Sequence, residues 1–156
     1  DNTGPGRARS GYPHRVVRYS VMSLGFQIYP DIQLLFIRGH GVITQTERVR
    51  TILAWLREPE YAACIDAIFD VSDAQSTPKV AELRELIGLL RQYRAAPDSG
   101  PRKLAIVTSK PIAFAMARVF GQLMVRENDP LEVKVFLNQD AAWAWLRPGA
   151  PPVVPR

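Results

Sequence analysis

The chain has few of the residues on which catalytic and covalent chemistry usually depends. Its 156 residues include one cysteine, Cys64, and two histidines, His14 and His40. A single cysteine excludes an internal disulfide and is typical of a reducing compartment, so we expect a cytoplasmic protein. Neither histidine has Cys, Asp or Glu neighbours at metal-site spacing. The sequence therefore gives no reason to expect a metal or a cofactor.

Long apolar runs are also missing. The longest stretch without a charged residue, Tyr19–Pro30, has only twelve residues and includes glycine, serine and glutamine. A helix that crosses a bilayer needs about 20 predominantly apolar residues. The arginine-containing start of the chain lacks the apolar segment of a secretory signal. We therefore expect no membrane-spanning segment and no membrane partner.

An excess of charge of one sign is confined to the two ends. The net charge is +5, of which residues 1–18 contribute +3 and residues 147–156 contribute +2, so that residues 19–146 are neutral overall. A nucleic-acid surface requires surplus Lys and Arg within the folded elements. The charge distribution therefore argues against a nucleic-acid partner.

Apolar periodicity divides the chain into one domain and two ends. Residues 1–15 and 148–156 lack such periodicity, which predicts a disordered basic arm and a Pro-rich tail. Between them, residues 16–147 predict a single domain of short alternating strands and helices.

The order of these elements predicts the fold class. Extended segments are expected at residues 17–28 (with a break near Gly25), 33–38, 65–71, 103–107 and 133–136. Helices are expected to begin at Thr44, Thr77, Ser109 and Asn138. This order predicts an α/β fold with a five-stranded mixed, mostly parallel sheet and about four helices. The short link at Pro30-Asp31 favours an antiparallel pairing of the first two strands.

A glycine turn follows the second strand. Gly39-x-Gly41-x-x-Thr44 is similar to a dinucleotide-binding fingerprint, but threonine replaces the third glycine and no acidic residue ends a strand about twenty residues later. Thr44 and Glu47 have the spacing of a capping box. We therefore interpret this segment as a turn and a helix cap.

Acidic and hydroxyl residues gather after the third expected strand. They are Asp70, Ser72, Asp73, Ser76 and Thr77. In an open α/β sheet, the carboxyl ends of the strands border the crevice where ligands bind. These residue types also form ordinary turns and helix caps, so both interpretations remain open. The functional one predicts a small-molecule or lipid-binding crevice.

The second expected helix has an unusually wide apolar face. One apolar line contains Val80, Leu83, Ile87 and Leu90, and a neighbouring line contains Leu86, Leu89 and Tyr93. On the last helix, placing Ala142, Trp145 and Leu146 on one face leaves Trp143 outward. Since monomers rarely expose so much contiguous apolar area, we expect a homodimer that buries Leu86, Leu89, Tyr93 and Trp143.

Two segments resemble the STAS superfamily of sulfate-transporter and anti-sigma-factor-antagonist domains. Ile65–Asp73, with its D-x-S ending, is similar to the central strand of that family. Val133–Phe136 followed by Asp140–Leu146 resembles the last strand and helix of an uncharacterised bacterial branch. The resemblance spans about residues 19–146 and implies a mixed sheet with alternating helices.

The chain departs from the antagonist members after Asp73. Those members carry a D-S-S-G box with a regulatory phosphoserine, whereas the corresponding positions here are Pro78-Lys79-Val80-Ala81. Ser76 and Thr77 precede them and could serve instead. No pair of groups is arranged for acid–base or nucleophilic chemistry. We therefore expect a non-enzymatic STAS-like regulatory or protein-interaction module, with ligand binding near Asp70–Thr77 as the alternative.

Overall fold

The computed structural model describes residues 16–150, so the arm and most of the tail expected from the sequence lie outside the described residues. The strands are β1 Val17–Val21, β2 Leu24–Tyr29, β3 Leu34–Gly41, β4 Asp66–Ala74, β5 Lys103–Val107 and β6 Glu132–Phe136. The helices are α2 Gln45–Arg57, α3 Val80–Tyr93, α4 Pro111–Arg126 and α5 Gln139–Leu146, with 3-10 turns η2 Pro30–Ile32 and η3 Pro59–Ala63.

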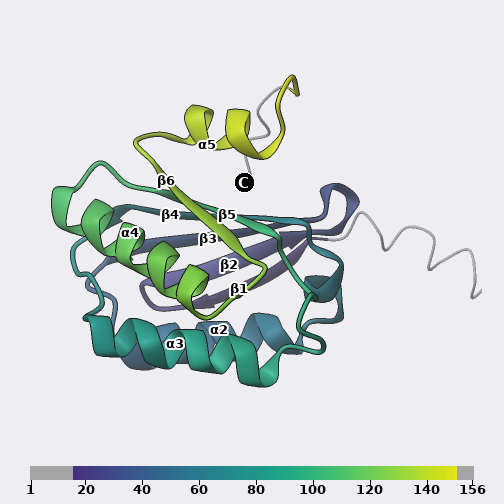
Figure 1. Cartoon of the computed structure of the whole chain (residues 1–156), viewed down its shortest axis with the longest axis horizontal. Helices are drawn as coiled ribbons and strands as arrows, with labels where there is room; N and C mark the ends of the chain where they lie inside the picture. Colours follow the sequence, from purple (N-terminus) through teal and green to yellow (C-terminus); the bar gives the residue numbers. More distant parts are fainter. Residues whose placement is uncertain (1–15, 151–156) are drawn as a thin grey trace, which may run out of the picture.

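The strands form one sheet whose spatial order equals the chain order, β1-β2-β3-β4-β5-β6. β1, β2 and β3 pair antiparallel, and β3 to β6 pair parallel, which confirms the predicted mixed sheet. Right-handed crossovers that all advance in one direction place their helices on the same face. α2, α3 and α4 accordingly lie on one face, and α5 lies on the other (Figure 1).

The number of strands differs from the prediction of five. The expected first strand is a hairpin, because the chain reverses at Met22-Ser23 and β1 pairs with β2 from Val17↔Ile28 to Val21↔Leu24. Met22 has a positive φ of 51°, which a tight hairpin turn requires. The break therefore falls before Gly25, at residues that are not typical of such turns.

The central strands are buried on both faces. In β3, Leu35 and Ile37 belong to the core under α2, α3 and α4, whereas Leu34 and Phe36 belong to a smaller core under α5. β2 is different, since only alternate residues are buried along it. The parallel centre of the sheet is thus covered on both sides, as parallel sheets usually are. The antiparallel edge is covered on one side only.

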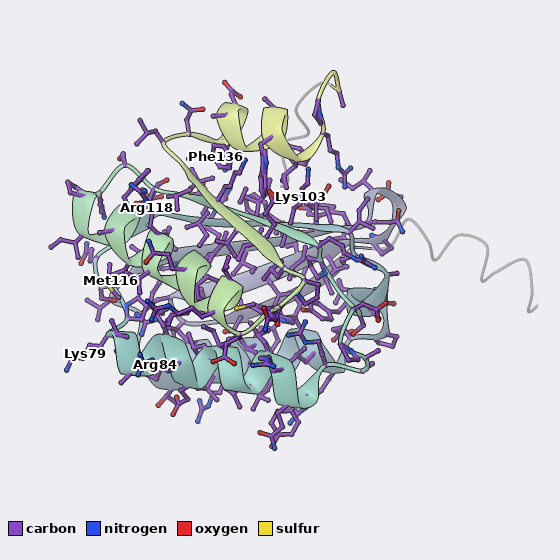
Figure 2. All side chains as sticks on the ribbon, viewed as in Figure 1. Lys79, Arg84, Lys103, Met116, Arg118 and Phe136 are labelled. Carbon is purple, nitrogen blue, oxygen red and sulfur yellow. The ribbon has the colours of Figure 1, made fainter. Side chains whose placement is uncertain are left out.

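The orientation of α5 corrects the prediction for Trp143. Trp143 is 3% exposed and packs with Ala142 and Leu146 against the sheet, so it is not outward. Trp145 is half-buried instead, beside Phe136 and within cation–π distance of Lys103. Figure 2 shows Phe136 and Lys103 beneath α5. Ala142 and Leu146 therefore lie on the expected face of this short helix, but Trp143 and not Trp145 is the buried tryptophan.

The predicted helix starts are confirmed at two positions and corrected at a third. Thr44 Oγ1 accepts a hydrogen bond from the Glu47 amide at 3.1 Å, and Asn138 Oδ1 accepts one from the Ala141 amide at 2.9 Å. α3 begins at Val80 and not at Thr77-Pro78. There the Glu82 carboxylate accepts a hydrogen bond from the Lys79 amide at 2.8 Å, so an acid in the first turn takes the place of a hydroxyl cap.

Candidate functional site

The five residues predicted to form one site lie on both faces of the sheet. β4 extends to Ala74, and its register against β3 shifts between Asp70 and Asp73, which interrupts the alternation of side chains. Asp70 bonds to α5 on one face. Ser76 and Thr77 line a cavity on the opposite face. The structure therefore does not bring the predicted cluster together, because the strand runs further than its apolar residues indicate.

Asp70 connects β4 to α5 by a hydrogen bond. Its carboxylate accepts hydrogen bonds from Gln139 Nε2 at 2.7 Å and from the Ser72 amide at 2.9 Å. Burial opposes ionisation, but the bonds from Gln139 and Ser72, together with nearby Arg38, hold the pKa of Asp70 below its ordinary value. The carboxylate is thus an ionised structural acceptor at neutral pH.

Ser76 joins two loops at the carboxyl edge of the parallel strands. Its hydroxyl accepts a hydrogen bond from the Ile43 amide at 2.8 Å and donates one to the Ile43 carbonyl at 3.1 Å. Ile43 lies in the loop before α2, and Ser76 lies in the loop before α3. A phosphate on this hydroxyl would remove the hydrogen that it donates to the Ile43 carbonyl.

A cavity of about 160 Å³ lies between the sheet and the three helices of the larger core. Its floor consists of sheet residues that include Leu35, Ile37, Leu104 and Ile106. α2, α3 and α4 form its walls, with Leu83, Leu86 and Phe120 among the lining side chains. α3 packs mainly on α2 and α4 and stands away from the sheet (Figure 1). The gap beneath α3 is therefore incompletely filled.

The cavity accounts for most of the wide apolar face of α3. Leu86 is 7% exposed and belongs to the core, so the expectation that it lies on a docking surface is wrong. Leu89 is half-buried against the same core, whereas Tyr93 is 53% exposed. A helix between two others and above a cavity needs apolar residues on three sides. The cavity and the two neighbouring helices therefore explain most of the width of this apolar face.

The charged side chain of Arg48 also lies among the apolar walls. Arg48, in the second turn of α2, is 8% exposed and lines the cavity. Its Nη1 donates to Gln45 Oε1 at 3.2 Å, and among the described residues no carboxylate lies within ion-pair distance of its guanidinium. Burial lowers the pKa of Arg48, although Glu82 and Glu47 counteract this. An arginine remains charged at neutral pH even so.

The far end of the cavity is closed by an ion pair. Arg94, immediately after α3, bonds to Asp129, and both residues line the cavity. The Asp129 side chain is 1% exposed. The cavity thus has two polar ends, of which one is neutralised and the other carries Arg48.

Groups suited to catalysis or metal binding do not gather in the part of the chain that the structure describes. Within residues 16–150, no three His, Cys, Asp or Glu side chains could hold a metal ion together. Burial raises the pKa of Cys64 to about 12, which disfavours its thiolate. No helix within these residues has the length and apolarity needed to cross a membrane.

Comparison with known proteins identifies the family. No curated protein sequence matches the chain. An uncharacterised protein of the DUF3478 family from Shewanella loihica PV-4, solved with a SpoIIAA-like fold, is 16% identical over 85% of this chain and 92% of that one, with a TM-score of 0.49. The sequence model of the SpoIIAA-like family matches residues 28–147, which confirms the resemblance to the STAS superfamily. Because this match covers well over half of its length, the chain belongs to the SpoIIAA-like family.

Proposed function

We propose that this protein is a non-enzymatic regulatory module of the STAS type whose input is a small apolar ligand bound beneath α3. Membership of the SpoIIAA-like family supports a regulatory role. The observation that supports ligand binding is the cavity between α3 and the sheet. This location replaces the crevice expected near Asp70–Thr77, because only two of its five candidate residues, Ser76 and Thr77, border the cavity.

The size of the cavity limits the ligand. An apolar cavity of roughly 150 Å³ is known to stay dry and to bind benzene. The present cavity, at about 160 Å³, admits the body of a comparably small molecule, such as one aromatic ring or a short alkyl chain. Filling it would restore the van der Waals contacts that the lining side chains lack. The ligand would therefore stabilise the fold as it binds.

A regulatory output follows from the position of α3. This helix packs on α2 and α4, and its underside borders the cavity. A ligand that binds one position of α3 more tightly than another shifts the protein toward that position. The outer surface of α3 is then the surface that reports occupancy to a partner.

The test is the thermal unfolding of the purified protein in the presence of neutral apolar probes, toluene and 1-hexanol. We expect both to raise the unfolding midpoint with a concentration dependence that saturates. Ala117, which is buried and lines the cavity, is changed to leucine to fill the space. Ala115, exposed on the same helix, gives the matched control Ala115→Leu.

In Ala117→Leu the stabilisation by the probes should disappear, and in Ala115→Leu it should persist. Absence of any saturable effect on the natural sequence would contradict ligand binding. An effect that is equal in all three proteins would place the probes elsewhere on the molecule.

A further inference from the structure

The buried charge at the rim of the cavity specifies the ligand further. We propose, building on the ligand-binding function above, that the cavity takes a small organic carboxylate whose apolar body fills the space under α3 and whose anionic group pairs with Arg48. Phenylacetate and hexanoate exemplify this class. The position, the burial and the few hydrogen bonds of the Arg48 guanidinium support this proposal.

Arg48 lies at the end of the cavity next to the carboxyl edge of the parallel strands. It belongs to the beginning of α2, which follows β3 directly, and the loop residues Ser76 and Thr77 line the cavity at this same edge. The opposite end is closed by Arg94 and Asp129. A ligand that enters at the Arg48 end would therefore leave its charged group there and place its apolar part inside.

Within the described residues the guanidinium has few partners, although none of its nitrogens is both fully buried and without a hydrogen bond. It has five N–H donors, and the described residues supply one hydrogen bond, to Gln45. The Gln45 amide in turn donates to the Glu82 carbonyl at 3.1 Å and to the Glu85 carboxylate at 2.8 Å, so it is already committed to α3. Buried charges are ordinarily paired. A bound carboxylate would supply the missing forked partner.

The nearby acids do not fill this role. Glu82 accepts a hydrogen bond from the Lys79 amide at the start of α3. Within residues 16–150, neither Glu82 nor Glu47 lies within ion-pair distance of Arg48. They stabilise the charge at a distance, and burial outweighs them in setting the pKa of Arg48. Among the described residues, the guanidinium thus has no directly bonded carboxylate at the rim of an apolar space.

A neutral or cationic ligand of the same shape would lack this interaction. A hydrogen bond to a charged group contributes about 1.5–3 kcal/mol, which corresponds to roughly ten- to a hundredfold in affinity. We therefore expect phenylacetate and hexanoate to bind at least about tenfold more tightly than 2-phenylethanol and 1-hexanol. 2-Phenylethylamine should bind more weakly than either phenyl compound.

The experiment is isothermal titration of the natural sequence and three variants with each matched pair. Arg48→Met removes the charge and keeps much of the side-chain volume, and Arg48→Lys keeps the charge without the forked geometry. Arg50→Met changes an exposed arginine of the same helix and is the control. Thermal unfolding of each variant establishes that it is folded. Trp55 fluorescence is a second readout, since Trp55 lines the cavity and Trp143 packs on the other face.

The preference for carboxylates over the matched alcohols should vanish in Arg48→Met, fall in Arg48→Lys and remain in Arg50→Met. The alcohols should bind to Arg50→Met as they bind to the natural sequence. Equal binding of carboxylates and alcohols to the natural sequence would overturn this inference and leave ligand binding intact. A preference that survives in Arg48→Met would overturn the assignment to Arg48. If neither the carboxylates nor the alcohols bind, both this inference and the ligand-binding function fail.

Discussion

Arg94 and Asp129 form a buried ion pair that joins the end of α3 to the turn before β6. Their side chains are 10% and 1% exposed, and Asp129 also accepts a hydrogen bond from the Leu131 amide at 3.0 Å. Removing one partner of a buried pair leaves the other charge uncompensated, which costs about 3–5 kcal/mol. We therefore expect Arg94→Met to lower the free energy of unfolding in urea by that amount.

An exposed pair nearby provides the control. Arg91 and Glu127 also link α3 to α4, but their side chains are 44% and 52% exposed. Such pairs contribute about 0–1 kcal/mol, so Glu127→Gln should have a small effect. Equal losses in the two variants would contradict a special role for the buried pair.

The Asp70–Gln139 contact predicts how stability depends on pH. Because the folded-state pKa of Asp70 is lowered, its ionised form stabilises the fold fully above the unfolded-state value of about 3.9. This contribution disappears as the pH falls through the lower folded value. Asp70→Asn should therefore be less stable than the natural sequence at pH 7, and the difference should shrink below about pH 4. Urea unfolding across this range measures it.

Asp73→Asn is the control for Asp70, because Asp73 is exposed near the end of the same strand. We expect its stability at pH 7 to change by no more than about 0.5 kcal/mol. If the difference in the free energy of unfolding between Asp70→Asn and the natural sequence stays constant down to pH 2, the loss of stability in the variant does not come from the ionisation of Asp70.

The two bonds between Ser76 and Ile43 predict the cost of changing this serine. Ser76→Ala removes a bond donor and acceptor at once and leaves the Ile43 amide without its acceptor. A loss of about 1–3 kcal/mol in the free energy of unfolding is expected. Ser76→Glu, which adds a charge at the same place, should lose more. A stable Ser76→Glu protein would instead make Ser76 a suitable position for a phosphate.

Self-association through α3 remains a prediction, and its test changes with the structure. Leu86→Glu would place a charge in the core and should unfold the protein, so it cannot report on a dimer. Tyr93 is exposed on the same helix, and Tyr93→Glu should convert the expected homodimer into a folded monomer. Sedimentation equilibrium measures both states. A natural sequence that stays monomeric at high concentration contradicts the dimer.

Local signals determined most of the elements from the sequence alone. Thr44 and Asn138 cap helices because a short hydroxyl or amide side chain bonds to an amide three residues away, which requires no distant contact. The apolar runs of β4 and β5 likewise indicate strands covered on both faces. The helices between parallel strands follow from the same pattern.

Tertiary structure decided the features that depend on neighbours. Trp143 is buried because α5 meets the sheet in one particular rotation, which eight residues of helix do not encode by periodicity. Asp70 and Ser76 lie apart because β4 continues as a strand beyond the apolar run that ends at Val71, and it stays paired with β3 as far as Ala74.

The candidate site also depends on tertiary structure. The sequence pattern predicts that Leu86 is an apolar residue in excess of what the core needs, and that Arg48 is an ordinary polar residue on an amphipathic helix. The packing of α3 on α2 and α4 sets its distance from the sheet. Because of this distance, Leu86 lines a cavity and Arg48 is a buried charge at the rim of that cavity. Distances between packed elements depend on the sum of many side-chain volumes, so no single stretch of sequence carries them.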